Sequence, residues 1–500
     1  MPITRRSFFK RSGLLAATSV TAPTVLQAAE PGAARPGQKP RHIIHLVSDG
    51  MSAGTLTCAD HLSHLLRKRG VTWIQLHNHP QARHGLMDMR SLDSLVTDSS
   101  AASSSWGSGS RIANGAVNIL PDGRELTPLY TLFGQAGWKR ALVTTTEITH
   151  ATPAGFAAND GSRGSAESIA AQYLDRKVEV LLGGGQKYYD PAKRKDKVDL
   201  WAKHQGAGYH VMKTREELLA APLDKRWVGT FDESHLPYTV DQNQSKEFQA
   251  RVPTLAEMTR AALKRLENEP HFIMQVEGGR VDHGCHQFDA AAAFYDQIAF
   301  DEAIEVCLEF QKKVPDTLLV ITTDHGNGNP GLSGIGKNYV ASPLLFANLK
   351  EAKASHTVML KQLGQAPTVA KVQAVLKELT GYAAPADKVE MFLPYLEKKG
   401  KPMFSLHSDP NAQLGLMLAN HLGVSFISAS HTSDFVPITA LGPGAEKFGG
   451  FIKNTDVFYD YLGFAGIDFR NPEMPLQTSL PANGEAVAAA EQPHWLETVA

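Results

Sequence analysis

Short runs of apolar and β-branched residues recur along the chain, and each run ends in a cluster of polar residues. These runs do not alternate between apolar and polar positions, so they suit parallel strands that are buried on both faces of a sheet. The runs occupy residues 42–47, 141–145, 178–182, 272–276 and 318–321.

Helical patterns lie between these runs, notably at residues 255–266 and 288–310. Alternating strands and helices predict an α/β fold with a central, mostly parallel sheet flanked by helices. In such folds the functional site lies at the carboxyl ends of the strands. Acidic and histidine residues follow several of the apolar runs, which is where this rule would put a site.

Two segments interrupt the alternation. Residues 186–250 are polar, and residues 327–430 combine a Gly/Asn-rich loop with helical periodicity near residues 369–379. We interpret both segments as insertions at the sheet edge that form a lid-like or crown-like region. The main domain would then span residues 41–470, followed by a C-terminal tail of residues 471–500.

The N-terminus has the order of an export signal. Arg5 and Arg6 precede an apolar, charge-free run at residues 13–26, and small residues follow. This order resembles a twin-arginine signal peptide over residues 1–29, with a Pro/Gly/Ala-rich linker over residues 30–40. We therefore expect a periplasmic or secreted protein. The alternative is an ordinary N-terminal tail with two neighbouring arginines.

Composition narrows the function classes. The chain has 500 residues, 42% of them apolar, and a formal net charge of -1. This balance gives no reason to expect binding to nucleic acid or to a membrane surface. Three cysteines are too few for a disulfide framework. No internal stretch approaches about 18 consecutive apolar residues, so we expect a mature chain without a membrane span.

Candidate metal ligands follow the apolar runs. They are Asp49, Glu277, Asp282, His286, Asp324, His325 and His431. Imidazole nitrogens combined with carboxylates suit zinc, whereas oxygen donors such as Asp49, Glu277 and a threonine hydroxyl suit magnesium. Each residue alone is more often a surface charge or a satisfied polar group. Their occurrence together at strand ends is what predicts a metal site.

A serine-rich segment, residues 96–106, carries a candidate nucleophile. Ser99 follows Asp98 at a position where a helix can begin. Backbone N–H groups and the helix dipole favour an alkoxide there, and a neighbouring zinc ion would lower the hydroxyl pKa further. The alternative interpretation is a Ser/Ala-rich loop without a catalytic role.

Taken together, these segments resemble the alkaline phosphatase family over roughly residues 42–450. The most specific match is Glu277-Gly278-Gly279-Arg280-x-Asp282-His283-x-x-His286. The other matching blocks, in the expected order, are the Ser99 segment, residues 150–154 with Arg163, residues 323–326 and residues 430–432. Ser100 stands where alanine is usual. The resemblance implies an alkaline-phosphatase-like fold with its catalytic domain at residues 41–470.

The resemblance also implies two zinc ions and one magnesium ion. The first zinc would be held by Asp282, His286 and His431, the second by Asp49, Asp324 and His325, and the magnesium by Asp49, Thr152 and Glu277.

By the same resemblance, the chain would hydrolyse small phosphate monoesters and form a homodimer. Ser99 would attack phosphorus to give a covalent phosphoserine, and the planar guanidinium of Arg163 would grip two phosphate oxygens. Two positions vary within the family. Histidine at both His150 and His283 looks more like animal members and leaves open whether the third ion is magnesium. Either residue could be a ligand of the third ion or could contact one of its ligands.

Two alternatives come from the same reasoning. The first is a phosphodiesterase of the same superfamily, although the Asp98-Ser99 pair with Arg163 favours monoesters. The second is a non-catalytic exported protein that binds phosphate or metal, which would be expected to lack the nucleophile or a ligand. The preferred reading requires the Ser99 hydroxyl to lie within about 8 Å of the point where the ligands meet.

Overall fold

The computed structural model describes residues 39–334, 336 and 338–477. The predicted signal peptide at residues 1–29 and most of the predicted linker lie outside the described residues, as do residues 478–500 of the predicted tail.

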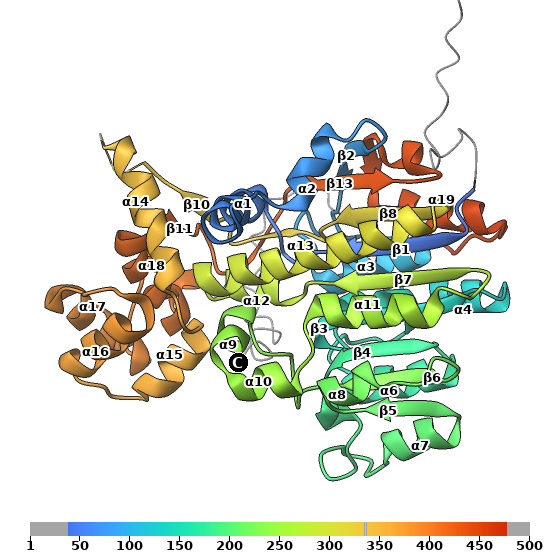
Figure 1. The fold of residues 1–500 in the computed structure, drawn as a ribbon, viewed down its shortest axis with the longest axis horizontal. Coiled ribbons are helices and arrows are strands. Elements are labelled where there is room, and N and C mark those ends of the chain that lie inside the picture. The colour runs from blue at the N-terminus through green and yellow to red at the C-terminus, as the bar shows by residue number, and fades with distance from the viewer. Residues whose placement is uncertain (1–38, 335, 337, 478–500) are drawn as a thin grey trace, which may run out of the picture. The chain divides into compact units, whose positions relative to one another are not determined.

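A ten-stranded sheet forms the centre of the fold (Figure 1). Its order is β14-β2-β13-β8-β1-β7-β3-β4-β6-β5. The strands are β1 (His42–Val47), β2 (Arg83–Asp88), β3 (Lys139–Glu147), β4 (Val180–Gly184), β5 (Tyr209–Met212), β6 (Arg226–Thr230), β7 (Phe272–Glu277), β8 (Thr317–Thr322), β13 (Val436–Leu441) and β14 (Gly450–Lys453). β13 pairs antiparallel with β2 and β8, and the other pairs are parallel. The predicted α/β fold with a mostly parallel sheet is therefore confirmed.

Four of the five predicted strands lie where the apolar runs indicated, and the third is displaced. The run at residues 178–182 predicted a strand that the structure begins at Val180 and ends at Gly184. Lys177 has a left-handed φ of 55°, and the Val178 N–H donates to the carbonyl of Tyr173 at 3.2 Å. The first residues of the run therefore complete a turn after a helix and cannot start the strand.

Three central strands align the residues that follow them. β1 lies between β7 and β8, with Val47 opposite both Glu277 and Thr322. All three strands are buried along their whole length, which explains their continuous apolar sequences. Because their carboxyl ends are level, the polar residues that follow them meet at one edge of the sheet.

Helices cover both faces of the sheet (Figure 1). On one face, Ile44 and Leu46 belong to the same apolar cluster as residues of α1 (Ala53–Arg67), α11 (Leu255–Leu266) and α13 (Ala290–Lys313). On the other face, Ile43 and Val47 pack in a cluster with residues of α3 (Ser99–Ser108), α5 (Ala151–Ala157), α6 (Ala166–Asp175) and α19 (Asn454–Ala465). The strand pleat thus directs alternate β1 side chains to two separate cores.

The segments read as insertions have different structures. Residues 186–250 carry β5 and β6, which continue the sheet to its edge, and then α9 (Thr239–Gln244) and α10 (Lys246–Arg251). Residues 327–430 are mainly helical: α14 (Ser342–Phe346), α15 (His356–Leu363), α16 (Val369–Thr380), α17 (Ala386–Leu396) and α18 (Pro410–Leu422). The periodicity near residues 369–379 correctly predicted α16. Within the described part of the chain, no helix has the length and apolar character needed to cross a membrane.

Candidate active site

The first group of candidate ligands comes from a helix and a short strand. α12 (Arg280–His286) places Asp282 and His286 one turn apart, with His286 Nε2 3.2 Å from Asp282 Oδ2. β12 (His431–Thr432) pairs antiparallel with β9 (Gly326–Asn327), which follows β8. This pairing brings His431 Nε2 to 3.7 Å from Asp282 Oδ1 and 3.1 Å from His286 Nε2.

Backbone carbonyls orient both histidines of this group. His286 Nδ1 lies 2.9 Å from the carbonyl oxygen of Ala429, and His431 Nδ1 lies 2.9 Å from that of Thr97. A carbonyl accepts hydrogen bonds and cannot donate them, so each Nδ1 carries the hydrogen and each neutral Nε2 carries a lone pair. Two lone pairs and the Asp282 carboxylate therefore point at the same space, and this donor set fits a divalent transition metal.

The second group is Asp49, Asp324 and His325, which follow β1 and β8. His325 Nε2 lies 3.3 Å from Asp324 Oδ2 and 3.6 Å from Asp49 Oδ1. These two oxygens are buried and have no hydrogen bond within the described part of the chain. Gly50, which adopts φ +70°, separates this group from Asp282; a Cβ at Gly50 would lie 2.4 Å from Asp282 Oδ1. Glycine therefore lets the first and second groups lie side by side.

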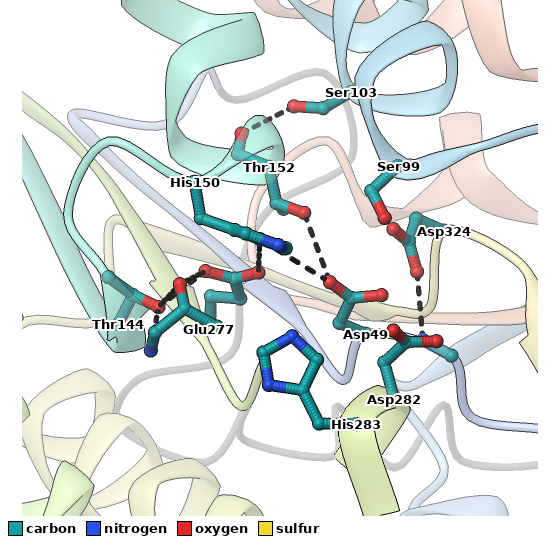
Figure 2. Close-up of polar contacts among 12 residues, drawn as sticks. Asp49, Ser99, Ser103, Thr144, His150, Thr152, Glu277, Asp282, His283 and Asp324 are labelled. Atoms are coloured by element: carbon teal, nitrogen blue, oxygen red, sulfur yellow. Dashed lines mark hydrogen bonds and ion pairs between the residues drawn. The ribbon is translucent and has the colours of Figure 1, made fainter. Parts of the chain in front are cut away.

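The third group is Asp49, His150 and Glu277 (Figure 2). His150 Nδ1 lies 3.8 Å from Glu277 Oε1 and 3.9 Å from Asp49 Oδ2, which also faces the Thr152 hydroxyl at 3.4 Å. Thr144 donates a 2.5 Å hydrogen bond to the other oxygen of Glu277. Glu277 Oε1 and His150 Nδ1 have no hydrogen bond to another described residue. This group offers mostly oxygen donors and one imidazole.

Charge also favours cations here. Burial, and then the neighbouring carboxylates, raise the pKa of Asp49 well above its usual range. Burial raises the pKa of Asp324 to about 7. Carboxylates this close together cannot all ionise in a buried site without positive partners. The donor types, the buried oxygens without hydrogen bonds and the excess of carboxylates all fit metal binding.

Ser99 is the first residue of α3 and lies at the edge of the second group. Its Oγ is 3.1 Å from His325 Nε2, and the residue is buried. The Asp98 side chain caps α3 by accepting a hydrogen bond from the Ala101 N–H at 2.8 Å. The Ser99 hydroxyl thus lies well inside the limit of about 8 Å that the sequence analysis set.

Arg163 reaches the same place from the loop before α6. Its Nη1 donates to Asp98 Oδ2 at 3.1 Å, and its Nη2 lies 3.4 Å from His150 Nε2. The guanidinium is mostly buried and stands between the Ser99 segment and the third group. It is therefore in a position to bind an anion beside the Ser99 hydroxyl.

Sequence reasoning named Asp98 only as the neighbour of Ser99, and it overlooked two other residues that contact this site, Thr144 and His235. Asp98 holds both α3 and Arg163, and its position directly before the helix was an available capping signal. Thr144 bonds Glu277 from the neighbouring strand β3. His235 packs against His283, with ring centroids 4.5 Å apart, and comes from the loop after β6. A single histidine in a polar segment carries no sequence signal for such a role.

His283 lies on α12, and its ring centroid is 5.5 Å from that of His150. It is outside the three groups of candidate ligands.

Comparisons with known proteins agree with this site. A family model described as alkaline phosphatase matches residues 40–466. Alkaline phosphatase 4 of Bacillus subtilis is 31% identical over 372 residues, covering 73% of this chain and 75% of that protein. Alkaline phosphatase 3 of the same organism is 30% identical over 370 residues, covering 72% and 75%. The crystal structure of Thermus thermophilus alkaline phosphatase superposes with a TM-score of 0.83 at 32% identity, covering 92% of this chain and 98% of that one.

Such similarity extends across the sheet and the three groups of ligands, and it is not confined to a short motif. A match over most of the chain, in sequence and in fold, means that this protein belongs to the alkaline phosphatase family and is a metal-binding enzyme that hydrolyses phosphate monoesters.

Proposed function

We propose that phosphate monoesters are hydrolysed through a covalent phosphoserine on Ser99. The observation that carries this proposal is the position of the Ser99 hydroxyl, buried at the start of α3 and 3.1 Å from His325 Nε2. A serine hydroxyl is a weak nucleophile at neutral pH unless its surroundings stabilise the alkoxide. The dipole of α3 supplies part of that stabilisation, since Ser99 is the first residue of this helix.

We further propose two zinc ions and one magnesium ion. Asp282, His286 and His431 would hold the first zinc, and Asp49, Asp324 and His325 the second. Asp49, Thr152 and Glu277 would hold magnesium, with His150 beside them. This assignment is supported by the imidazole-rich first group and the oxygen-rich third group. When bound, such ions act as Lewis acids that offset phosphoryl charge and favour the ionised form of the serine hydroxyl.

The reaction proceeds in two displacements. Ser99 Oγ loses its proton and forms a bond to phosphorus while the bond from phosphorus to the alcohol oxygen breaks. The departing oxygen keeps the electron pair and takes up a proton, so that it leaves as the alcohol. Water then attacks the phosphoserine, releases inorganic phosphate and restores the Ser99 hydroxyl.

The residues beside Ser99 orient the phosphoryl group. Arg163 binds two phosphoryl oxygens with its planar fork and so keeps phosphorus in line with Ser99. Asp98 holds the guanidinium in place through its 3.1 Å hydrogen bond.

We also propose that the enzyme is a homodimer. Phe435 and Phe451 are 55% and 60% exposed, and the centroids of their rings are 5.0 Å apart. Leu86 on the adjacent strand β2 is 47% exposed. Apolar groups gathered on a surface favour association, and a second copy of the chain would cover them.

Ser99→Ala tests the proposed mechanism. We expect no acid-stable phosphoenzyme after a rapid quench with ³²P-labelled substrate, and at least a ~10³-fold loss of kcat. Zinc and magnesium content, measured by elemental analysis, should stay close to that of the wild type, because Ser99 is not among the proposed ligands.

Ser105→Ala is the matched control. Ser105 lies on the same helix, is buried and donates to the carbonyl of Ala101 at 2.9 Å. This variant should still form the phosphoenzyme. A labelled phosphoenzyme in Ser99→Ala would mean that another residue is the nucleophile, and the proposal would be wrong.

A further inference from the structure

The hydrogen bond between Arg280 and His283 determines which nitrogen of His283 carries its hydrogen. Arg280 Nη1 lies 2.5 Å from His283 Nδ1. A guanidinium has no acceptor atom, so Nδ1 of His283 must accept. The hydrogen of the neutral imidazole is then on Nε2, which makes Nε2 a hydrogen-bond donor and leaves it without the lone pair that a metal ligand needs.

Arg280 is held in place independently of His283. Its guanidinium lies 3.7 Å from the centroid of the Tyr238 ring, a cation–π contact with a buried aromatic side chain. Its backbone N–H donates to Thr145 Oγ1 at 3.2 Å. The guanidinium therefore has a fixed position from which to bond His283.

His283 faces the third group of ligands. Figure 2 shows one nitrogen of its ring turned toward the carboxylates of Asp49 and Glu277 and the other turned away from them. His283 is 2% exposed. Its ring lies between two other imidazoles, with its centroid 5.5 Å from that of His150 and 4.5 Å from that of His235. Because Arg280 bonds Nδ1, the nitrogen that faces the third group is the one that carries hydrogen.

We propose that Arg280 is a positioning residue that keeps His283 out of the ligand set of the third metal site. His150 is oriented in the same way, because Arg163 Nη2 lies 3.4 Å from its Nε2 and its hydrogen is therefore on Nδ1. With both imidazoles as hydrogen-bond donors, the site keeps its oxygen ligands. With the other tautomer of His283, the site would gain an imidazole lone pair and would favour zinc or cobalt over magnesium. The inference rests on the third site of the proposed function and explains how a site beside three histidines remains suited to magnesium.

Arg280→Met removes the donor and tests the inference. The purified variant, with zinc in the first two sites, is titrated with magnesium and with cobalt, and the third equivalent is quantified by elemental analysis. We expect the preference for cobalt over magnesium to rise about tenfold or more, because an added imidazole ligand favours cobalt over magnesium. The visible absorption of bound cobalt should also change, because a nitrogen donor has been added.

Two further variants show whether the effect passes through His283. Arg280→Lys keeps a donor without an acceptor and should restore the preference for magnesium. The double variant Arg280→Met/His283→Gln lacks the His283 imidazole and should also prefer magnesium. Arg260→Met is the control for loss of a positive charge, because Arg260 pairs with Glu309 on the surface; its metal preference should equal that of the wild type.

The inference is overturned if folded Arg280→Met keeps the wild-type preference, or if the single and double variants shift equally. If Arg280→Met does not fold, Tyr238→Leu is the substitute, because it removes the aromatic ring that the guanidinium contacts. It should shift the preference toward cobalt by a smaller factor. Phosphoenzyme formation on Ser99 is measured separately in the wild type. Its absence would refute the proposed function without changing the metal titration.

Discussion

Asp98 supports two features of the proposed active site with one carboxylate. It accepts hydrogen bonds from the Ala101 N–H at 2.8 Å, the Ser100 hydroxyl at 2.8 Å and Arg163 at 3.1 Å. Burial tends to raise the pKa of Asp98, but the Arg163 charge and the hydrogen bonds outweigh it and hold the pKa below its usual range. The orientation of α3 and the position of Arg163 therefore depend on the same ionised side chain.

Asp296 gives a pH-dependent prediction away from the ligands. It is buried on α13 and accepts hydrogen bonds from the N–H and hydroxyl of Thr239 at 3.0 and 3.1 Å. Burial raises its pKa from 3.8 to about 7. The folded chain thus binds a proton that the unfolded chain releases, so this group lowers the free energy of unfolding as pH rises from about 4 to 7.

We expect Asp296→Asn to be more stable than the wild type at pH 8 and to lose that advantage toward pH 5. The difference in the free energy of unfolding should change by a few kcal/mol across this range. Denaturant unfolding of both proteins measures this difference. The metal-free form is used so that pH-dependent release of metal does not contribute. Asp387→Asn, at a side chain that is 69% exposed, should show no such trend. A pH-independent difference for Asp296→Asn would contradict the prediction.

Sequence motifs indicated candidate ligands more readily than the residues that contact them. The Glu277–His286 segment carries several candidate residues within ten positions, and their spacing is itself a signal. His235 and Thr144 are isolated in the sequence and reach the site through the packing of distant strands. Their roles follow from three-dimensional contacts that no local pattern encodes.

At the scale of elements, the contact between α3 and α5 depends on two glycines. A Cβ at Gly107 of α3 would lie 1.9 Å from the carbonyl oxygen of Gly155 on α5, which is closer than any real contact. Ser103 of α3 donates to the carbonyl of Thr152 at 2.6 Å across the same contact. The helix that begins with Ser99 and the helix that carries Thr152 therefore touch through their backbones.

Gly107→Ala should separate these helices and lower the free energy of unfolding by about 1–3 kcal/mol, the usual effect of overpacking. Thermal unfolding of the metal-loaded enzyme measures the loss. Gly206→Ala on α7 (Leu200–Gly206) is the matched control, since a Cβ there meets no atom within 4 Å. The control should be neutral or gain about 0.4–1 kcal/mol. Equal stability of the two variants would show that the close contact is not required.

Elements differed in how far the sequence could predict them. β1, β7 and β8 have mostly apolar sequences because helices cover both of their faces, and the sequence therefore predicted them as strands. β2 did not, because it contains charged residues and is partly exposed toward the sheet edge. β9 and β12 have two residues each, too few for any periodicity, although their pairing brings His431 to the site.

At the scale of the whole molecule, the three groups of candidate ligands join segments that are far apart in the chain. Removing metal from the wild type should therefore weaken the fold as well as abolish activity. If each ion is present at about 1,000 times its dissociation constant, each contributes about 4 kcal/mol to the free energy of unfolding. Chelation should lower the melting temperature by several degrees, and re-adding zinc and magnesium should restore it.

Differential scanning calorimetry before and after chelation measures this effect. A sample dialysed without chelator controls for handling, and elemental analysis confirms that the ions have left. An unchanged melting temperature in demonstrably metal-free protein would mean that the groups are rigid without ions and that metal does not stabilise the fold.

The pairing of β12 with β9 also has a consequence for synthesis on the ribosome. His431 is the last of the proposed ligands, and it lies several hundred residues after Asp49. At about 5–20 residues per second, a nascent polypeptide would wait tens of seconds between the emergence of these two side chains. The first group of candidate ligands therefore cannot be complete in a truncated product that stops before β12, so prematurely terminated chains would carry no finished metal site.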